Sequence, residues 1–252
     1  MTGMHLLEEI ESDYGTINIL QSRSTGAMIY KLGGCNQSFA DSNGTSLASY
    51  IHAIFGLLSQ AKSRNILVIG GGGGTLATML VRVRCKATIV DVNPASFALA
   101  KRYFALPESV ICHTADGKSF LHSDTNVYDA IVLDAFHGDR IPSHLQSPRF
   151  FEQVRDHLTP GGAVFANVHV KHDFDGFADG IAKNMRTAWA DVRVLDAEGV
   201  CGRNAIVMAG RVSHLRAPPL LVSPQTNASI IDDDLARLRF RAWKVSRWDF
   251  GG

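Results

Sequence analysis

Short apolar runs alternate with amphipathic stretches over much of the chain, and this alternation predicts its architecture. Five apolar runs have the length of buried strands, at 65–69, 87–91, 109–113, 128–133 and 162–168. Apolar positions three or four residues apart predict helices at 75–83, 94–104, 116–121, 147–158 and 175–189. Strands that alternate with helices in this way form a parallel sheet covered on both faces. We therefore expect a doubly wound α/β fold.

Two further apolar runs, at 191–195 and 204–209, extend this sheet to seven mostly parallel strands. Helix starts are marked by Asn93 and Ser147, because each precedes a proline and can cap the helix that follows. We expect this region, 46–212, to form one nucleoside-binding domain.

The first part of the chain has a different pattern. Residues 15–32 alternate weakly around a turn, which predicts a small antiparallel unit, and residues 33–45 are rich in turn formers. We assign a small N-terminal β unit to 1–45. Ser46 can then cap a helix. The apolar face of this helix would consist of Leu47, Tyr50, Ile51, Ile54 and Leu58.

The tail, 213–252, is expected to contain an amphipathic helix. Acidic residues at 232–234 would lie near its start and Lys244 beyond them, as the helix dipole prefers. A basic amphipathic helix could touch a membrane or an anionic partner. We favour docking on its own domain or on a second subunit, because Trp243 and Trp248 in a short tail usually pack.

The composition limits the possible function classes. The chain has 252 residues, 46% hydrophobic and 19% charged, which suits a large globular domain with a substantial core. A net charge of +1 gives no electrostatic basis for binding nucleic acid or a membrane. We recognise no signal peptide, and no run approaches the roughly 18 apolar residues of a membrane helix. Four widely spaced cysteines favour free thiols in a reducing cytoplasm over disulfides or a zinc site.

A run of glycines follows the first apolar strand of the sheet. Glycine adopts positive φ without cost and lets a ligand approach the backbone closely. The helix behind it adds free N–H groups to the same space. Asp91 ends the second strand, twenty-one residues after Gly70, where a carboxylate can accept ribose hydroxyls. We therefore predict that a nucleoside-bearing ligand binds at Gly70, Gly71, Gly72, Gly74, Asp91 and Val92.

The sequence leaves the kind of nucleoside partly open. The looser dinucleotide fingerprint G-x-G-x-x-A fits residues 72–77, so NAD is one alternative. The spacing G-x-G-x-G over 70–74 is instead that of S-adenosylmethionine enzymes, and Asp116 with Gly117 stands where those enzymes hold adenine. Asp116 could also serve only as the cap of its own short helix. A phosphate-binding P-loop is excluded, because no Gly-Lys-Ser/Thr follows the glycines.

The fourth strand ends in Asp134, which is followed by His137 and Asp139. Ligands of open α/β sheets bind at the carboxyl ends of the strands. Asp134 should therefore lie on the same rim as the glycines, Asp91 and Asp116. We predict that these groups share one crevice.

A possible metal site follows the fifth strand. His169, His172, Asp173 and Asp175 include a His-x-x-His spacing that can ligate zinc. No cysteine or further histidine stands at a supporting spacing. We therefore expect no metal, and interpret this segment as a solvated loop or the rim of an acceptor pocket.

Together these motifs resemble those of the spermidine synthase (polyamine aminopropyltransferase) superfamily. The similarity rests on Gly-Gly-Gly at 70–72, Val-Asp at 90–91, Asp-Gly at 116–117, Phe-Leu at 120–121 and Tyr-Asp-x-Ile-x-x-Asp at 128–134. The N-terminal part agrees through Glu-Ser-x-Tyr-Gly at 11–15, Gln-Ser at 37–38 and Tyr50. Spermidine-synthase-like proteins also share Asp-Ala-Phe at 134–136, Ile-Pro-x-His-Leu at 141–145 and Phe-Phe at 150–151. The resemblance implies a class I methyltransferase-like Rossmann fold and S-adenosylmethionine or its decarboxylated form as donor.

Departures from the family pattern fall on the acceptor side. The family carries an Asp after its third glycine, where this chain has Gly73. The second acid of the family's Asp-Ser-Ser-Asp-Pro is displaced to Asp139, and the polyamine-binding Glu corresponds to His52. An imidazole is a poor substitute for a carboxylate against a cationic polyamine. The resemblance therefore supports the donor class better than a polyamine acceptor.

We expect a transferase that moves a methyl or aminopropyl group to a small amine, as a cytoplasmic homodimer. Asp134 is the expected base or acceptor anchor. His137, Asp139 and Tyr50 are further catalytic candidates, and Gln37 could cover the donor. The alternatives are a true polyamine aminopropyltransferase, an NAD-binding oxidoreductase, and a nucleoside-binding protein without catalysis.

Overall fold

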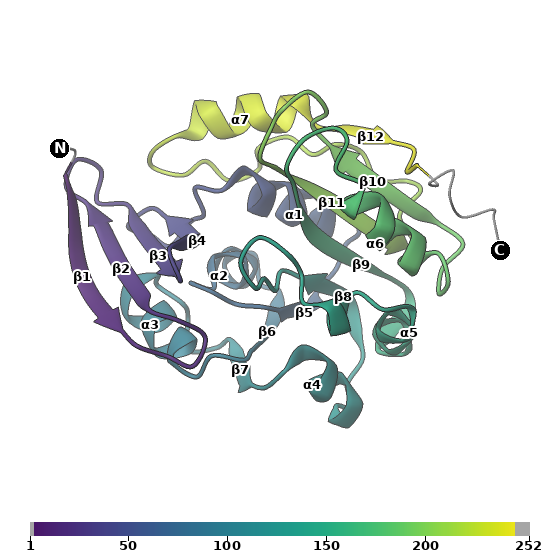
Figure 1. The fold of residues 1–252 in the computed structure, drawn as a ribbon, viewed down its shortest axis with the longest axis horizontal. Coiled ribbons are helices and arrows are strands. Elements are labelled where there is room, and N and C mark those ends of the chain that lie inside the picture. The colour runs from purple at the N-terminus through teal and green to yellow at the C-terminus, as the bar shows by residue number, and fades with distance from the viewer. Residues whose placement is uncertain (1–2, 245–252) are drawn as a thin grey trace.

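The computed structural model describes residues 3–244 and contains two sheets of different size (Figure 1). A four-stranded sheet comes first in the chain. The larger part of the molecule is an eight-stranded sheet with helices on both faces, so the expected α/β class is confirmed.

The N-terminal sheet is an antiparallel meander in the order β1-β2-β3-β4. Its strands are β1 (Met4–Ile10), β2 (Ile17–Ser22), β3 (Met28–Leu32) and β4 (Cys35–Ala40). The β2–β3 hairpin is the unit expected at 15–32, whereas the expectation of a turn-rich loop at 33–45 is wrong over β4. Gly33 and Gly34 both have positive φ and form a tight turn, so the polar residues after them pair with β3.

The main sheet has the order β12-β10-β11-β9-β8-β5-β6-β7. Its parallel strands are β5 (Asn65–Ile69), β6 (Lys86–Asp91), β7 (Ile111–Thr114), β8 (Tyr128–Leu133) and β9 (Leu158–Val170). Antiparallel pairs add β10 (Val192–Asp196), β11 (Arg203–Gly210) and β12 (Arg239–Arg241). The expected seven mostly parallel strands are thus corrected to eight in a mixed sheet, because the tail adds β12 beside β10.

Helices cover both faces of the main sheet with their apolar sides. They are α1 (Ser49–Gln60), α2 (Thr75–Arg82), α3 (Ala95–Tyr103), α4 (Gly117–Ser123), the 3-10 turn η1 (Ser143–Leu145), α5 (Pro148–Asp156), α6 (Phe177–Met185) and α7 (Ala228–Arg237). Helices α1, α2 and α7 share one core cluster, and α4, α5 and α6 share the other. Helix α3 packs on the N-terminal sheet through Leu99 and thereby joins the two sheets. None of the described helices is long and apolar enough to span a membrane.

Ser147 and Ser46 were both predicted to cap a helix, and only one of them does so. Ser147 caps α5 as predicted, because its Oγ accepts the Phe150 N–H at 3.2 Å. The cap predicted at Ser46 is wrong: α1 begins at Ser49, and the Ser46 hydroxyl accepts the Ala48 N–H at 3.1 Å instead. The Ser46 backbone still forms a β-bridge to the N-terminal sheet, so the helix cannot begin there.

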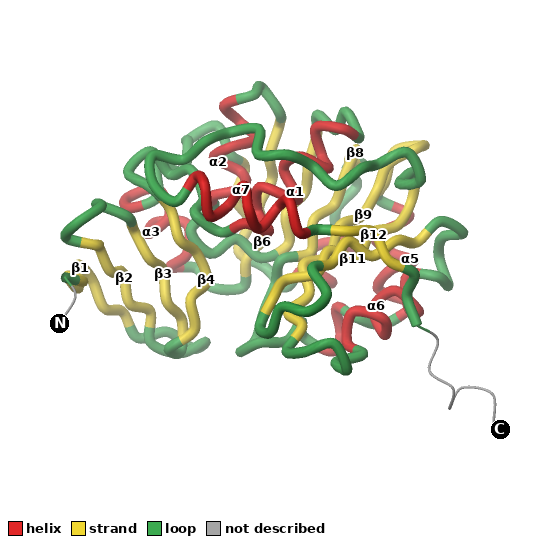
Figure 2. Tube along the Cα trace, turned by 90° about the horizontal axis from the view of Figure 1, so that it is seen from above, coloured by secondary structure: helices red, strands yellow, loops and turns green. Residues whose placement is uncertain are grey.

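The tail returns over the main sheet, and α7 lies against α1 (Figure 2). Helix α7 buries Ile231 and Leu235. The prediction that the acids at 232–234 open this helix is wrong, because the helix begins at Ala228 and carries them in its middle. Trp243 packs against the main core, and Trp248 lies outside the described residues. The described part of the tail therefore docks on its own domain.

Candidate active site

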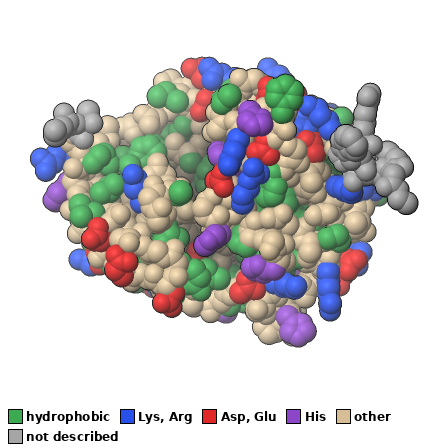
Figure 3. All heavy atoms as spheres, in the orientation of Figure 1, with side chains coloured by type: hydrophobic (Ala, Val, Ile, Leu, Met, Phe, Trp, Pro, Cys, Tyr) green, Lys and Arg blue, Asp and Glu red, His purple; other side chains and the backbone are tan. Residues whose placement is uncertain are grey.

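A cavity of about 480 Å³ lies at the carboxyl ends of the parallel strands, beside the N-terminal sheet. Figure 3 shows this face hollowed, with histidine side chains around the depression. Most of the predicted site residues line the cavity, namely Gly70, Gly71, Gly72, Asp91, Val92, Asp116, Gly117, Gln37, Asp134 and His137. The predicted residues Gly74, Tyr50 and Asp139 are not part of its lining.

The glycine loop owes its shape to three left-handed residues. Gly70, Gly72 and Gly74 have φ of +91°, +47° and +68°, so the alternating spacing is a backbone requirement. A Cβ on Gly70 would also overlap the Asp134 backbone. Helix α2 begins directly after Gly74 without a side-chain cap. The loop therefore leaves N–H groups of the first turn of α2 without side-chain partners.

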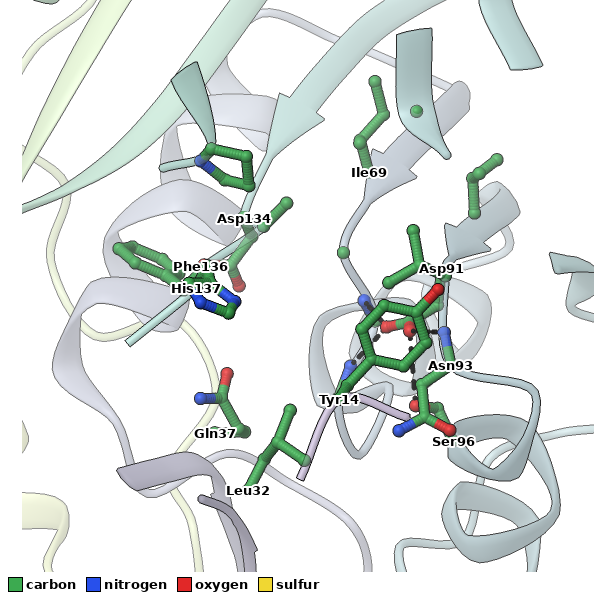
Figure 4. A pocket seen from close by; sticks show the side chains of 18 of the residues that line it. Tyr14, Leu32, Gln37, Ile69, Asp91, Asn93, Ser96, Asp134, Phe136 and His137 are labelled. Atoms are coloured by element: carbon green, nitrogen blue, oxygen red, sulfur yellow. Dashed lines mark hydrogen bonds between the residues drawn. The ribbon is translucent and has the colours of Figure 1, made fainter. Parts of the chain in front are cut away.

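Asp91 holds the glycine loop as well as lining the cavity (Figure 4). Its Oδ2 accepts the Gly71 N–H at 2.8 Å and the Gly72 N–H at 3.3 Å. Its Oδ1 accepts the Asn93 N–H at 2.8 Å and the Ser96 hydroxyl at 3.3 Å. Since a carboxylate has about four lone-pair positions, a ribose would have to displace one of the longer contacts. The sequence spacing predicted that Asp91 lies at the site, but not that its carboxylate also binds the backbone of the glycine loop.

Asp116 caps its helix and also lines the cavity. Its Oδ1 caps α4 by accepting the Ser119 N–H at 2.9 Å, and its Oδ2 lies 2.6 Å from His144 Nε2. Burial raises the pKa of Asp116, but hydrogen bonds from Ser119 and His144 outweigh this and leave the pKa below its ordinary value. The carboxylate is therefore ionised at neutral pH and lines the cavity while His144 occupies one of its oxygens.

Asp134 follows β8 and lies between the cavity and α1. Its Oδ1 accepts from Asn167 Nδ2 at 2.8 Å, and its Oδ2 accepts from the Tyr50 hydroxyl at 3.3 Å. Burial raises the pKa of Asp134 to about 7, although both hydrogen bonds oppose the rise. Burial and the neighbouring carboxylate also raise the pKa of Tyr50, which keeps its hydroxyl protonated. Asp134 can therefore exchange a proton near neutral pH, as a general base must.

A row of amides continues behind Asp134. Asn167 is buried in β9, and its Oδ1 accepts from Asn204 Nδ2 at 2.9 Å. Sequence reasoning missed this row. The available signal was Asn167 itself, because an amide within an apolar strand needs buried partners.

His137 and Asp139 lie apart although both follow the same strand. His137 lines the cavity, and Figure 4 shows it with Phe136 near Asp134. Asp139 lies outside the cavity, and its carboxylate binds Lys171 at 2.7 Å. The structure therefore groups Asp134 with His137, while Asp139 has an ionic partner of its own.

Gly73 and His52, two positions that depart from the family pattern, are both packed against neighbouring residues. Gly73 donates its N–H to Ser38 Oγ at 2.8 Å, and a Cβ there would stand 2.8 Å from the Phe104 ring. His52 is buried in α1 with its Nε2 2.7 Å from the Ser46 carbonyl. Neither position lines the cavity.

The two aspartates among the candidate metal ligands have other partners. Asp173 binds Arg203 at 2.9 Å, and Asp175 binds Arg140 at 3.2 Å. Within residues 3–244, no group of three or more His, Cys, Asp or Glu is arranged to hold a metal ion. The two aspartates thus fasten this loop to neighbouring arginines.

Other cavity residues come from outside the predicted set. Tyr14, Asn93 and Ser96 also line the cavity, and Figure 4 shows them on the same side as Asp91. Tyr14 belongs to the Glu-Ser-x-Tyr-Gly motif, which was the available signal. Ser96 lines the cavity because α3 begins close to the end of β6, and no sequence motif marks this serine.

A family model described as the spermine/spermidine synthase domain matches residues 49–194, more than half of the chain. The chain belongs to the spermine/spermidine synthase family. The matched segment of this family member runs from α1 into β10 and contains the glycine loop, Asp91, Asp116 and Asp134.

Curated relatives align with only part of this family member. A probable polyamine aminopropyl transferase of Bifidobacterium longum is 34% identical over 140 residues, or 52% of this chain and 31% of that protein. An N-terminal histidine N-methyltransferase of Emericella nidulans is 32% identical over 108 residues, or 41% of this chain and 19% of that protein. The matched part is less than a third of either relative.

A solved structure extends the likeness of fold over nearly the whole chain. A probable spermidine synthase of Corynebacterium glutamicum superposes with a TM-score of 0.74 at 22% identity. The alignment covers 95% of this chain and 90% of that one. The fold shared with that structure therefore includes both the N-terminal sheet and the main sheet.

Proposed function

We propose that this protein transfers an alkyl group, methyl or aminopropyl, from an S-adenosylmethionine-type donor to a small amine. The observation that carries the proposal is Asp134, which has a pKa of about 7 and lines the same cavity as the glycine loop and Asp91. A nucleoside site beside a carboxylate that titrates near neutrality meets the needs of such a transfer. Family membership supports the transferase class.

In the proposed reaction the acceptor nitrogen attacks the carbon beside the donor's sulfonium. The C–N bond forms as the C–S bond breaks, and the neutral thioether leaves without needing a proton. The acceptor's ammonium group must lose a proton before its nitrogen can attack, and we assign the Asp134 carboxylate as the base that accepts this proton. Tyr50 and Asn167 hold opposite oxygens of that carboxylate, so the base is oriented before the acceptor arrives.

The nucleoside part of the donor is assigned to the remainder of the cavity. Its ribose would replace one of the two 3.3 Å contacts of Asp91. Its adenine amino group would bind Asp116 after His144 turns away. Val92, Gly117 and Gln37 complete the walls around it.

Aminopropyl transfer from decarboxylated S-adenosylmethionine is the second candidate, favoured by the name of the Bifidobacterium longum relative. The name of the Emericella nidulans relative supports methyl transfer instead. The chain's own residues favour the broader proposal, because Gly73 supplies no carboxylate for a propylamine and His52 is buried away from the cavity.

Calorimetric titration of the purified protein tests the proposal. We expect methylthioadenosine and at least one of the two sulfonium donors to bind, and NAD not to bind. The bound donor, incubated with small amines, should then yield a product whose mass gain identifies a methyl or an aminopropyl group. Binding of NAD without methylthioadenosine would favour the oxidoreductase, and donor binding without any transfer would favour a nucleoside-binding protein.

A further inference from the structure

A second cavity, of about 440 Å³, adjoins the first. Gln37 lines both cavities, and Tyr50 lines the second while its hydroxyl binds Asp134. Asn204 forms another connection, because it lines the second cavity and donates to Asn167, which donates to Asp134. The proposed base is therefore linked to both cavities.

The two cavities differ in the groups that they offer. The first contains the glycine loop, Asp91 and Asp116, which the proposed donor would occupy. An acceptor whose nitrogen reaches Asp134 needs room for the rest of its body. The second cavity offers this room across the wall that Gln37 and Tyr50 form.

The ionisable lining of the second cavity is unsuited to a second ammonium group. Its charged side chains are Arg203, Arg237 and Asp234. Asp234 is already engaged, because it accepts the Ser49 hydroxyl at 2.7 Å and lies 3.7 Å from Arg237. Arg203 binds Asp196 at 2.6 Å and Asp173 at 2.9 Å. An ammonium placed here would lie beside two guanidinium groups, and the one carboxylate of the lining already has both Ser49 and Arg237 as partners, which is unfavourable.

The remaining polar lining consists of amides and hydroxyls. These side chains are Asn36, Gln37, Asn204, Ser38, Ser49 and Tyr50. The hydroxyls of Ser49 and Tyr50 already donate their protons to Asp234 and Asp134. The three amides, Ser38 and Arg237 can still donate hydrogen bonds to oxygen. The lining therefore matches an oxygen-bearing group better than a cation.

We propose that the second cavity binds the far end of the acceptor, and that this end carries a hydroxyl or carboxylate oxygen. The acceptor is then a monoamine with an oxygen-bearing end and not a diamine. This inference rests on the proposed function, because it names the acceptor of the same reaction. The amine would reach Asp134 past Gln37 and Tyr50.

Three amines of equal length test the inference, namely 4-amino-1-butanol, 4-aminobutanoate and 1,4-diaminobutane. Titrated into protein loaded with methylthioadenosine, the alcohol or the amino acid should bind at least about tenfold more tightly than the diamine, the equivalent of one modest ionic contact. The stronger of the two identifies which oxygen group is preferred. Equal or tighter binding of the diamine, or no binding of all three, overturns the inference. Failure of methylthioadenosine itself to bind contradicts the proposed function before any amine is added.

A charge variant makes the test independent of absolute affinities. Asn36 is exposed and lines the second cavity, so Asn36→Asp adds a carboxylate there at little cost to folding. We expect the ratio of diamine to alcohol affinity to rise about tenfold. Asn227→Asp makes the same exchange at an exposed position outside both cavities and should leave the ratio unchanged. An equal response of both variants overturns the inference.

A filling variant tests whether the acceptor uses this cavity. Val200 is 36% exposed on the loop before β11 and lines the second cavity. Val200→Trp should weaken binding of the preferred amine about tenfold and leave methylthioadenosine binding unchanged. Val127→Trp replaces another exposed valine, outside both cavities, and should change neither. Unchanged amine affinity in Val200→Trp overturns the inference.

Discussion

Burial of the Asp134 carboxylate affects both the proposed chemistry and the stability of the fold. An aspartate has a pKa of about 3.9 in an unfolded chain, and burial raises that of Asp134 to about 7. Between these two pKa values Asp134 is protonated in the folded protein and ionised in the unfolded chain. The free energy of unfolding therefore falls as the pH rises from about 3.9 to about 7, and it stays at the lower value above pH 7.

Asp134→Asn should separate these effects. The amide keeps the size of the side chain, so methylthioadenosine affinity should stay near that of the wild type. The transfer rate should fall by about 10²–10⁴, the usual contribution of a positioned base. The deficit should shrink at high pH, where the amine is deprotonated in solution. Stability at pH 8 should rise by about 1–3 kcal/mol, because a buried charge is removed.

Rate profiles over pH, calorimetry and urea unfolding measure these three results. The wild-type rate should rise through about pH 7 as the carboxylate ionises. Full activity of the Asn variant at neutral pH would show that Asp134 is neither base nor anchor. The site would then be a donor-binding site of other chemistry.

At the scale of the element, the glycine loop contains glycines for two different reasons. Gly70, Gly72 and Gly74 are required by their positive φ. Gly73 does not have positive φ; instead, the Phe104 ring and Ser38 occupy the space that its side chain would take. The acid that the family carries at this position is therefore excluded by packing and not by backbone conformation.

Gly73→Asp tests this distinction. The new side chain would press on the fully buried Phe104, so the free energy of unfolding should fall by about 1–3 kcal/mol. Preference for the decarboxylated donor should not appear. Gly176→Asp is the control, because nothing lies within 4 Å of a Cβ there, and it should be close to neutral. Urea unfolding and donor titrations provide the measurements; a stable variant with tighter binding of the decarboxylated donor would show that Phe104 yields.

Elements with apolar runs could be predicted from the sequence, and elements held mainly by pairing could not. The prediction for β8 matches its bounds, and that for β5 matches as well, because both strands are buried on both faces. Strands β1 and β4 bury few side chains, and β12 has only three residues, so no periodic signal marks them. Ser46 failed as a cap because a bridge to another sheet decided its conformation.

The candidate site could be predicted as far as parallel topology determines it. Asp91 ends β6 and Asp134 follows β8, the two strands that flank β5, and parallel strands end at one edge of a sheet. Asn167 and Asn204 meet only through the antiparallel register of β9 and β11, which the sequence does not specify. The second cavity depends on the tail, since Asp234 and Arg237 form part of its wall.

At the scale of the whole molecule, an ionic network fastens the tail to the sheet. Arg241 on β12 binds Asp196 at 2.9 Å and Asp179 on α6 at 2.7 Å. Asp196 is only 1% exposed and also binds Arg203 at 2.6 Å. Burial raises the pKa of Asp196, but hydrogen bonds from Arg203 and Arg241 outweigh this and leave the pKa below its ordinary value. This network therefore stabilises the fold only while Asp196 is ionised.

Arg241→Ala should expose the size of this contribution. Removing the guanidinium leaves two largely buried carboxylates without one of their partners, so stability at pH 7 should fall by about 3–5 kcal/mol. A depressed carboxylate pKa contributes stability above its unfolded value of about 3.9 and loses it on acidification. The difference between wild type and variant should therefore narrow below about pH 4. Arg239→Ala, on the same strand but without an acidic partner in the described structure, should cost less than about 1 kcal/mol at any pH. Arg241 lines neither cavity, so the affinity of the folded variant for methylthioadenosine should equal that of the wild type. Urea unfolding measures the stabilities. Equal stability of the two variants would show that the tail is held by packing alone.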